Sequence, residues 1–260
     1  MSASRSGARE PHRALASLLN ADASGTLRVR IWRGAAAGRF ESYDVPRHAS
    51  QTVLDVVTHV QRHVDPSLAY RYACRVGMCG SCAMTVNGKA RWTCRTHVDA
   101  VAANDVLEIA PLSHLPIVRD LVVDMTPFFD KWAAAKGSFS PTATRTDEFA
   151  RVPPNSRKRR AIDQTIECIG CGVCYASCDV VGWKPDYLGP AALNRAWTLV
   201  NDVRDGAGIS RVRAVATDAG CHACHTHESC TERCPKHLTP TASIAGLKRL
   251  VALAALKGTL

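Results

Sequence analysis

The sequence predicts an α+β chain with a β-rich N-terminal domain and a helical C-terminal domain. Three observations indicate this fold class. The first half has alternating apolar residues and an Asn-Gly turn signal. Segments with apolar residues at helical spacing dominate the second half. Twelve cysteines fall into three groups of four, one group in the first half and two in the second.

The first half is expected to form a small mixed sheet. Residues 27–32 alternate in polarity and predict a strand, which pairs with residues 40–45 across a glycine-bearing turn at 34–38. Residues 52–64 carry valines at helical spacing, so they predict a helix capped by Thr52 or Ser50. Asn87-Gly88 is a strong hairpin signal between strands at 83–86 and 90–93, and a last strand follows at 106–110.

The second half is expected to be helical. Long helices are predicted over residues 117–136, 189–203 and 241–256, with a short one over 173–177. A surface excursion is expected at 137–156, which is rich in Ser, Thr and Pro, and a polar turn at 201–208. We place the domain boundary near residue 115. The predicted parts are a flexible N-terminal tail (1–24), a first domain (25–115) and a second domain (116–260).

Composition and charge exclude several classes of protein. No apolar run reaches the roughly 18 residues that a membrane span needs, because Lys248 and Arg249 interrupt the most apolar end. The N-terminus lacks a continuous apolar stretch, so we expect no secretory signal; its scattered arginines resemble a transit peptide only weakly. The net charge is +10, yet the one dense basic run, residues 157–160, has no aromatic platform beside it. We therefore expect no nucleic-acid partner and interpret that run as a solvated linker or helix start.

The cysteines indicate metal or redox chemistry. Without a signal peptide, a disulfide scaffold is disfavoured. The first group reads C-x4-C-x2-C, with its fourth cysteine after the predicted hairpin; the members are Cys74, Cys79, Cys82 and Cys94. This is the plant-type spacing of a [2Fe–2S] cluster. Gly77 and Gly80 allow the loop to turn tightly and aim backbone N–H groups at the sulfurs. Zinc sites prefer two separated C-x2-C knuckles, so zinc is the weaker alternative.

The second and third groups resemble the bacterial ferredoxin run, in which the fourth cysteine ligates the other cluster. Two clusters are therefore expected to exchange ligands across a pseudo-repeat. The predicted [4Fe–4S] ligands are Cys168, Cys171, Cys174 and Cys234. The predicted [3Fe–4S] ligands are Cys178, Cys224 and Cys230.

The third centre leaves one alternative open. A cysteine is expected midway between Cys224 and Cys230, and His227 stands there instead. Three cysteines suit a three-iron cluster with an empty corner. Cys221 is either a packed free thiol or, like His227, a group that reaches this corner and makes the cluster [4Fe–4S].

At this point the sequence resembles a known family, the iron–sulfur subunits of succinate dehydrogenase and fumarate reductase (respiratory complex II). The resemblance covers about residues 25–250. It is carried by CRVGMCGSC (74–82), PIVRDLVVDM (116–125), CIGCGVC (168–174) and CHTHESCTERCPKHLTP (224–240). It implies a plant-type ferredoxin-like β-grasp domain followed by an all-α bacterial-ferredoxin-like domain. It also implies an electron-transfer subunit of succinate:quinone oxidoreductase, in the respiratory chain and the tricarboxylic acid cycle.

The resemblance further implies partners and a place in the cell. Electrons would pass from FAD on a flavoprotein subunit through [2Fe–2S], [4Fe–4S] and [3Fe–4S] to a quinone at the membrane-anchor subunits. No catalytic residue for succinate is expected on this chain. By position, Trp183 and His225 match the family's residues near the quinone, and we add His227 as a third candidate. The implied location is peripheral, on the cytoplasmic face of the bacterial inner membrane.

Three alternatives stay open at this stage. The chain can belong to a quinol:fumarate reductase, since the direction depends on cluster potentials and quinone type. It can be a soluble iron–sulfur relay of another flavoenzyme. A zinc-binding adaptor is the alternative from another class, and iron and sulfide analysis would decide it.

Overall fold

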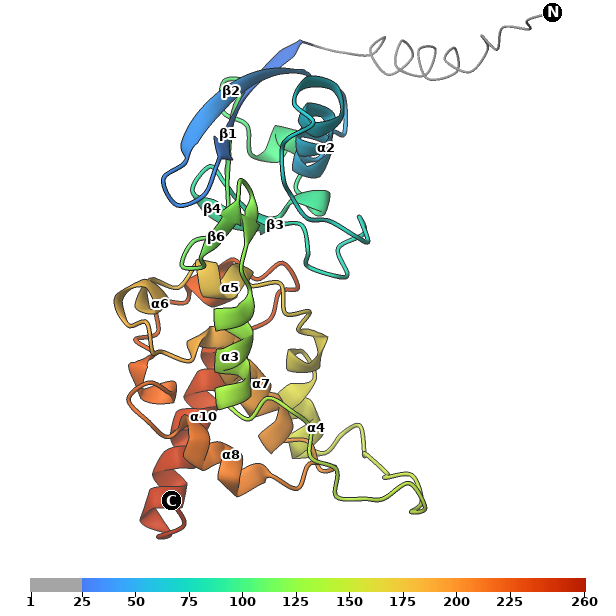
Figure 1. Ribbon diagram of the computed structural model, residues 1–260. Coiled ribbons are helices and arrows are strands. Elements are labelled where there is room, and N and C mark those ends of the chain that lie inside the picture. Colours follow the sequence, from blue (N-terminus) through green and yellow to red (C-terminus); the bar gives the residue numbers. More distant parts are fainter. Residues whose placement is uncertain (1–24) are drawn as a thin grey trace, which may run out of the picture.

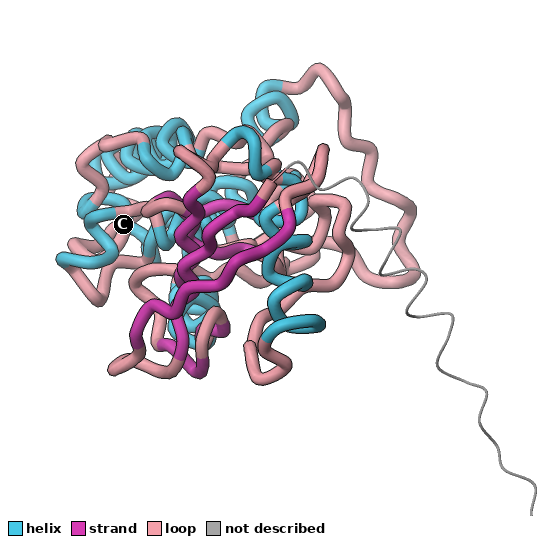
Figure 2. The backbone as a smooth tube through the Cα atoms, turned by 90° about the horizontal axis from the view of Figure 1, so that it is seen from above, coloured by secondary structure: helices cyan, strands magenta, loops and turns pink. Residues whose placement is uncertain are grey.

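The computed structural model describes residues 25–260, and the expected flexible tail at 1–24 lies outside the described residues. Figure 1 shows a sheet-containing part stacked on a helical part, with the C-terminus at the far end of the helical part. Figure 2, seen from above, shows the strands grouped together, with helices on several sides of them. The predicted α+β class is confirmed.

One mixed five-stranded sheet forms the N-terminal part, with the order β2-β1-β5-β3-β4. Strands β1 and β5 are parallel, and the other neighbours are antiparallel. The strands are β1 (Thr26–Arg33), β2 (Arg39–Pro46), β3 (Ala83–Val86), β4 (Lys89–Trp92) and β5 (Val106–Ala110). The predicted strands are thus confirmed, and Asn87 and Gly88 both have positive φ at the hairpin between β3 and β4.

Helix α2 (Val53–His59) packs its valines against the sheet. Of the two predicted caps, Thr52 is the one used: its side chain accepts from the backbone N–H of Asp55, whose carboxylate in turn accepts from the N–H of Thr52. The helix continues as a π-helical turn, η1 (Val60–Val64). This helix fixes the segment that leads into the first cysteine loop.

The helix predicted over 117–136 is wrong in its first part. Residues there form a hairpin of β6 (Ile117–Arg119) and β7 (Val122–Val123), and helix α3 (Thr126–Ala134) follows. Asp120 has φ +50° at the turn, and its buried carboxylate accepts hydrogen bonds from the backbone N–H groups of Gly34 and Ala69. These tertiary contacts hold the hairpin against the N-terminal part. Pro127, in the first turn of α3, suits a helix start.

The C-terminal part is built from helices with short connections. The helices are α4 (Arg157–Ile162), α5 (Val173–Ala176), α6 (Asp179–Trp183), α7 (Gly189–Val200), α8 (Gly208–Val215), α9 (Ser229–Glu232) and α10 (Pro240–Leu256). Among residues 25–260 there are also five 3₁₀ or π turns: η1, η2 (Thr93–Arg95), η3 (Val98–Ala100), η4 (Thr165–Glu167) and η5 (Cys221–Ala223). The predicted helices at 173–177, 189–203 and 241–256 are confirmed within a few residues. Helices α6, α8 and α9 were not predicted.

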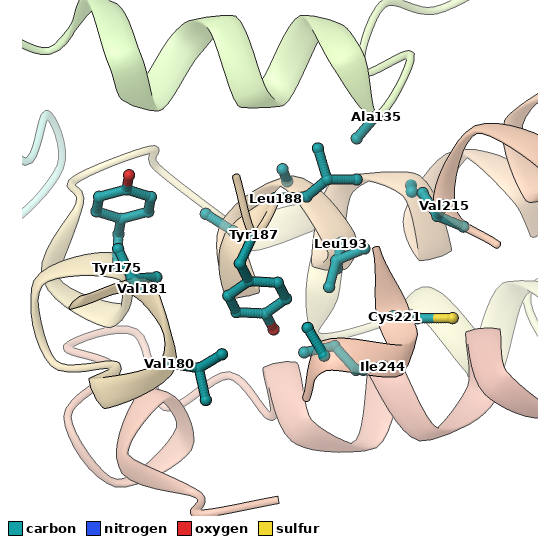
Figure 3. Packing of buried hydrophobic residues seen from close by; sticks show 14 of the residues in the cluster. Ala135, Tyr175, Val180, Val181, Tyr187, Leu188, Leu193, Val215, Cys221 and Ile244 are labelled. Atoms are coloured by element: carbon teal, nitrogen blue, oxygen red, sulfur yellow. The ribbon is translucent and has the colours of Figure 1, made fainter. Parts of the chain in front are cut away.

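The two largest hydrophobic cores of the described residues correspond to the two parts. The first lies between α2 and the sheet, and the second lies among α3, α5, α7 and α10. Figure 3 shows buried side chains of the second core, including Tyr187, Leu193 and Ile244. Leu112 and Leu115 belong to the second core, whereas Leu121 packs in the first. The chain passes between the cores over this stretch, and a boundary near residue 115 remains our proposal.

Candidate metal centres

The first cysteine loop forms a cradle of backbone donors around Cys74. Three backbone N–H groups donate to its sulfur at 3.3–3.4 Å, those of Val76, Met78 and Cys79. Gly77 and Gly80 have φ of +75° and +73°, as the predicted tight turn requires. The hydrogen bonds from Met78, Val76 and Cys79 lower the pKa of Cys74 to about 6. They stabilise the thiolate, which is the form that binds iron.

The other side of this centre is buried. Cys82 and Cys94 pack with Leu54 and are 3% and 6% exposed. Burial, together with the neighbouring Cys82 thiol, raises the pKa of Cys94 to about 11. The hydroxyl of Thr93 donates to the carbonyl of Cys82 at 2.8 Å and joins the two segments. One wall of the centre is therefore rigid and dry, and the other faces solvent.

The second centre is a cavity lined by four cysteines from two distant segments. They are the four predicted [4Fe–4S] ligands, Cys168, Cys171, Cys174 and Cys234. The remaining lining is largely apolar and includes Ala191, Leu238 and Pro240. Burial raises the pKa of Cys171 to about 12 and that of Cys174 well above its ordinary value. Thiols in such a place become thiolates only with a compensating metal, so the donor set fits a cluster.

The third centre is a neighbouring cavity lined by three cysteines. They are the predicted [3Fe–4S] ligands, Cys178, Cys224 and Cys230. His227 lines the same cavity. Tyr187 also lines it, and sequence reasoning missed this residue because nothing in its local pattern marks it. Burial first, and then the nearby cysteines, raise the pKa of Tyr187.

The two cysteine segments of the C-terminal part repeat each other in structure. Cys168 and Cys224 are 56 residues apart, and the same offset relates turn η4 to η5 and helix α5 to α9. The hydrogen bond from Ser177 N–H to the Val173 carbonyl (3.0 Å) has its equivalent from Arg233 to Ser229 (3.0 Å). This pseudo-repeat brings a cysteine at the end of each segment, Cys178 or Cys234, to the cavity of the other segment.

Cys221 lies outside both cavities. The offset pairs it with Thr165, which is also a buried residue in front of its cysteine segment. Cys221 is fully buried in the second core. Figure 3 shows its sulfur directed away from Val180 and Tyr187, two residues that line the third centre.

The three candidate quinone residues lie together at the edge of the third centre, whose cavity His225 and His227 both line. Trp183 is 70% exposed, and its ring meets that of His227 edge-on with centroids 6.0 Å apart. The rings of His225 and His227 have centroids 6.2 Å apart. Trp183 and His225 line an open cavity together with Lys184 and His222, which sequence reasoning did not single out. A basic and aromatic edge therefore adjoins the third centre.

The first and second centres approach each other between the two parts of the chain. Cys79 and Gly80 from the first loop line one cavity with Cys171 and Gly170 from the second. Its apolar lining includes Met125 from the segment that joins the two parts. The three centres therefore follow one another from the first loop to Trp183.

A single-ion site needs its ligands within about 2–2.5 Å of one point. In the described part of the chain, no three His, Cys, Asp or Glu side chains converge in this way.

Among residues 25–260, no helix combines the length and apolar character that crossing a bilayer requires.

Comparisons with known proteins agree with these centres. Residues 26–130 match the family described as "2Fe-2S iron-sulfur cluster binding domain", and residues 164–238 match "4Fe-4S dicluster domain". The chain is 36% identical to succinate dehydrogenase [ubiquinone] iron-sulfur subunit 1, mitochondrial, of Oryza sativa subsp. japonica, over 76% of this chain and 70% of that protein. It is 34% identical to the fumarate reductase iron-sulfur subunit of Escherichia coli O157:H7, over 78% and 82%.

A solved structure also resembles this chain. A chain of the Mycobacterium smegmatis Sdh1 complex in the apo form matches with a TM-score of 0.78 and 28% identity. The match covers 87% of this chain and 95% of that one.

Proposed function

The chain belongs to the family of iron–sulfur subunits of succinate dehydrogenase and fumarate reductase, and from this premise we propose how its residues relay electrons between a flavoprotein and a quinone. The observation that carries the proposal is the succession of three cysteine-lined centres, with the first loop at one end and Trp183 at the other. The enzyme is an oxidoreductase complex, of which this chain is the subunit without flavin.

We assign the ligands of the first centre from its cysteine loop and hairpin, and those of the second and third centres from their cavities. The [2Fe–2S] cluster is held by Cys74, Cys79, Cys82 and Cys94. The [4Fe–4S] cluster is held by the four cysteines of the second cavity. The third cluster, [3Fe–4S], is held by Cys178, Cys224 and Cys230. When bound, these clusters supply one-electron carriers in series.

The protein's own residues prepare these positions. Backbone N–H groups hold the Cys74 thiolate, and such hydrogen bonds also raise the reduction potential of a cluster. Buried apolar residues such as Ala191 and Leu238 line the second centre and limit the access of water to its sulfurs. The close approach of Gly80 to Cys171 keeps the first two centres near each other.

The two ends of the chain suit two different partners. At the first centre, Val76 and Met78 are 59% and 60% exposed beside Cys74. Exposed apolar side chains next to a redox centre suit docking of the flavoprotein subunit. At the other end, Trp183 with Lys184 and His222 suits the membrane anchor and the quinone head group. The chain is then peripheral on the membrane through its anchor, at the cytoplasmic face in a bacterium.

Two assays on the purified complex test this arrangement. Trp183→Ala is expected to lower succinate-dependent quinone reduction at least tenfold, because it removes a group from the quinone end. Electron transfer to a soluble dye that accepts from the flavin should stay within twofold of wild type. Equal loss in both assays would contradict the assignment of Trp183 to the quinone end.

EPR of the oxidised and reduced complex should show three distinct iron–sulfur signals. Metal analysis that finds zinc without iron and sulfide would contradict the whole proposal.

The physiological direction rests on cluster potentials. Relatives named for either direction match this chain about equally well. A redox titration of the [2Fe–2S] signal decides it: a high potential favours succinate oxidation, and a very low one favours fumarate reduction by a quinol.

A further inference from the structure

The backbone around His227 copies the backbone around Cys171. The 56-residue offset of the pseudo-repeat pairs these two residues. Their neighbours share left-handed conformations: φ is +63° at Gly170 and +61° at Thr226, and +77° at Gly172 and +64° at Glu228. The hydrogen bonds that follow are also equivalent, since Ala176 N–H to Gly172 and Glu232 N–H to Glu228 both measure 2.9 Å. His227 therefore occupies the place in its loop that a cysteine of the second centre occupies in the other loop.

This conformation is unfavourable for the residues that adopt it. Glycines allow positive φ without penalty, but a β-branched threonine in the left-handed region is a genuine outlier. The strain comes from the backbone alone and not from a steric clash of the side chain. At the equivalent Gly170, an added Cβ would meet no atom within 4 Å. The loop thus keeps a strained shape on both sides of His227. Such strain persists where the surrounding structure fixes a functional geometry.

The position of His227 places it at the third centre. It lines the same cavity as Cys178, Cys224 and Cys230. Three thiolates leave one corner of a cubane-type cluster without a protein ligand. A neutral imidazole is a good iron ligand and replaces cysteine in some iron–sulfur centres.

Resting on the proposed function, we propose that His227 faces the open corner of the third cluster and binds a fourth iron there. The reduced core [3Fe–4S]⁰ takes up one Fe²⁺ and becomes [4Fe–4S]²⁺, so charge and iron balance. One imidazole nitrogen donates its lone pair to the added iron and, where it carries a proton, releases that proton to solvent. The reducing electron comes from succinate through the relay, or from dithionite in the test. The third centre then exchanges between three-iron and four-iron forms.

The test measures iron uptake by the purified complex. The anaerobic complex is reduced with dithionite, given ⁵⁷Fe²⁺ and desalted, and Mössbauer spectroscopy then counts the iron added to the third cluster. Wild type is expected to gain about one iron per complex, and the EPR signal of the three-iron cluster should fall in proportion. His227→Leu should gain none and keep its full three-iron signal. His225→Leu should behave as wild type: this equally exposed histidine lines the same cavity, but the 56-residue offset pairs it with Ile169 and not with a cysteine.

His227→Cys serves as the positive control, since it places a thiolate where Cys171 stands in the other loop. The proposal is overturned if His227→Leu takes up as much iron as wild type, because another ligand then fills the corner. It is also overturned if only His227→Cys takes up iron, or if no variant does while the three-iron signal is present. Absence of any three- or four-iron signal at this centre would instead overturn the proposed function together with this inference.

Discussion

Gly80 in the first cysteine loop lies directly against Cys171 in the second. A Cβ built on Gly80 would stand 2.5 Å from the Cβ of Cys171 and 2.8 Å from its Cα, closer than side-chain atoms can approach. Any larger residue at position 80 must therefore move one of the loops. A glycine at this position sets how near the first two proposed clusters can come.

Gly80→Ala is expected to weaken the magnetic interaction between the reduced first and second clusters, because the added methyl group forces the two loops apart. Power saturation of the [2Fe–2S] EPR signal measures this interaction. Gly88→Ala is a matched control: its φ is also +73°, but its Cβ would meet nothing within 4 Å. Both variants carry the same backbone strain, of the order of 1 kcal/mol. Identical saturation curves for the two variants would show that the contact does not set the distance.

The second prediction concerns a buried ion pair. Arg211 and Asp205 are both 0% exposed in their side chains, and a guanidinium nitrogen lies 2.7 Å from the carboxylate. The backbone N–H of Ser140 also donates to Asp205, so the pair fastens the surface excursion to the turn before α8. Asp205→Asn leaves the arginine charge buried without its partner. It should lower the free energy of unfolding by about 3–5 kcal/mol, as measured by urea unfolding of the anaerobic protein.

An exposed pair supplies the control for that experiment. Arg159 in α4 and Asp163, the residue that caps its C-terminal end, are 2.8 Å apart at i,i+4, and the Asp163 side chain is 72% exposed. Asp163→Asn should change the unfolding free energy by only about 0.3–0.5 kcal/mol. A loss in Asp205→Asn no larger than this would mean that the buried pair contributes nothing to stability.

The third prediction follows from the donors around Cys74. In the cluster-free chain, its folded state verified by circular dichroism, Cys74 should react with iodoacetamide with a pH midpoint near its pKa of about 6. Because the pKa is lowered, the reactive thiolate dominates above this midpoint and disappears below it. Cys94, whose pKa is raised to about 11, should stay mostly unmodified at pH 7. Peptide mass spectrometry reads both sites, and a Cys74 midpoint near the ordinary thiol value of about 8.5 would contradict the role of the N–H donors.

Cysteine spacing made the grouping of the centres predictable, because each loop is a local structure whose turns depend on nearby residues. The glycines at 77 and 80 are an example: their positive φ is required by the tight turn itself. The spacing also predicted which cysteines share a cavity, because the exchange of Cys178 and Cys234 between the two cavities follows from the repeat. Local sequence information was sufficient for these cysteine loops, although it missed the short local helices α6, α8 and α9.

Tertiary contacts account for what the sequence could not predict. Residues 117–123 have a helix-like pattern, yet Asp120 is drawn into contact with Gly34 and Ala69, which are distant in sequence. Its charge predicts that Arg211 lies at the surface. In the folded chain the ion pair with Asp205 offsets the cost of burying this charge. Tyr187 lines the third centre because the folded chain brings it beside cysteines that are distant in sequence. No local signal encodes these long-range partners.

The fourth prediction concerns Cys221, the cysteine left without a centre. It is fully buried in the apolar core and occupies the place of Thr165 in the pseudo-repeat, so we expect no role as a ligand. Cys221→Ala removes the sulfur and leaves a small cavity, which should lower the free energy of unfolding by about 1 kcal/mol. The EPR signal of the third cluster should keep its shape and intensity. Cys230→Ala, which removes a cysteine that lines the third cavity, should abolish that signal. If Cys221→Ala alters the signal as strongly as Cys230→Ala does, the third cluster has a ligand that the offset of the repeat does not predict.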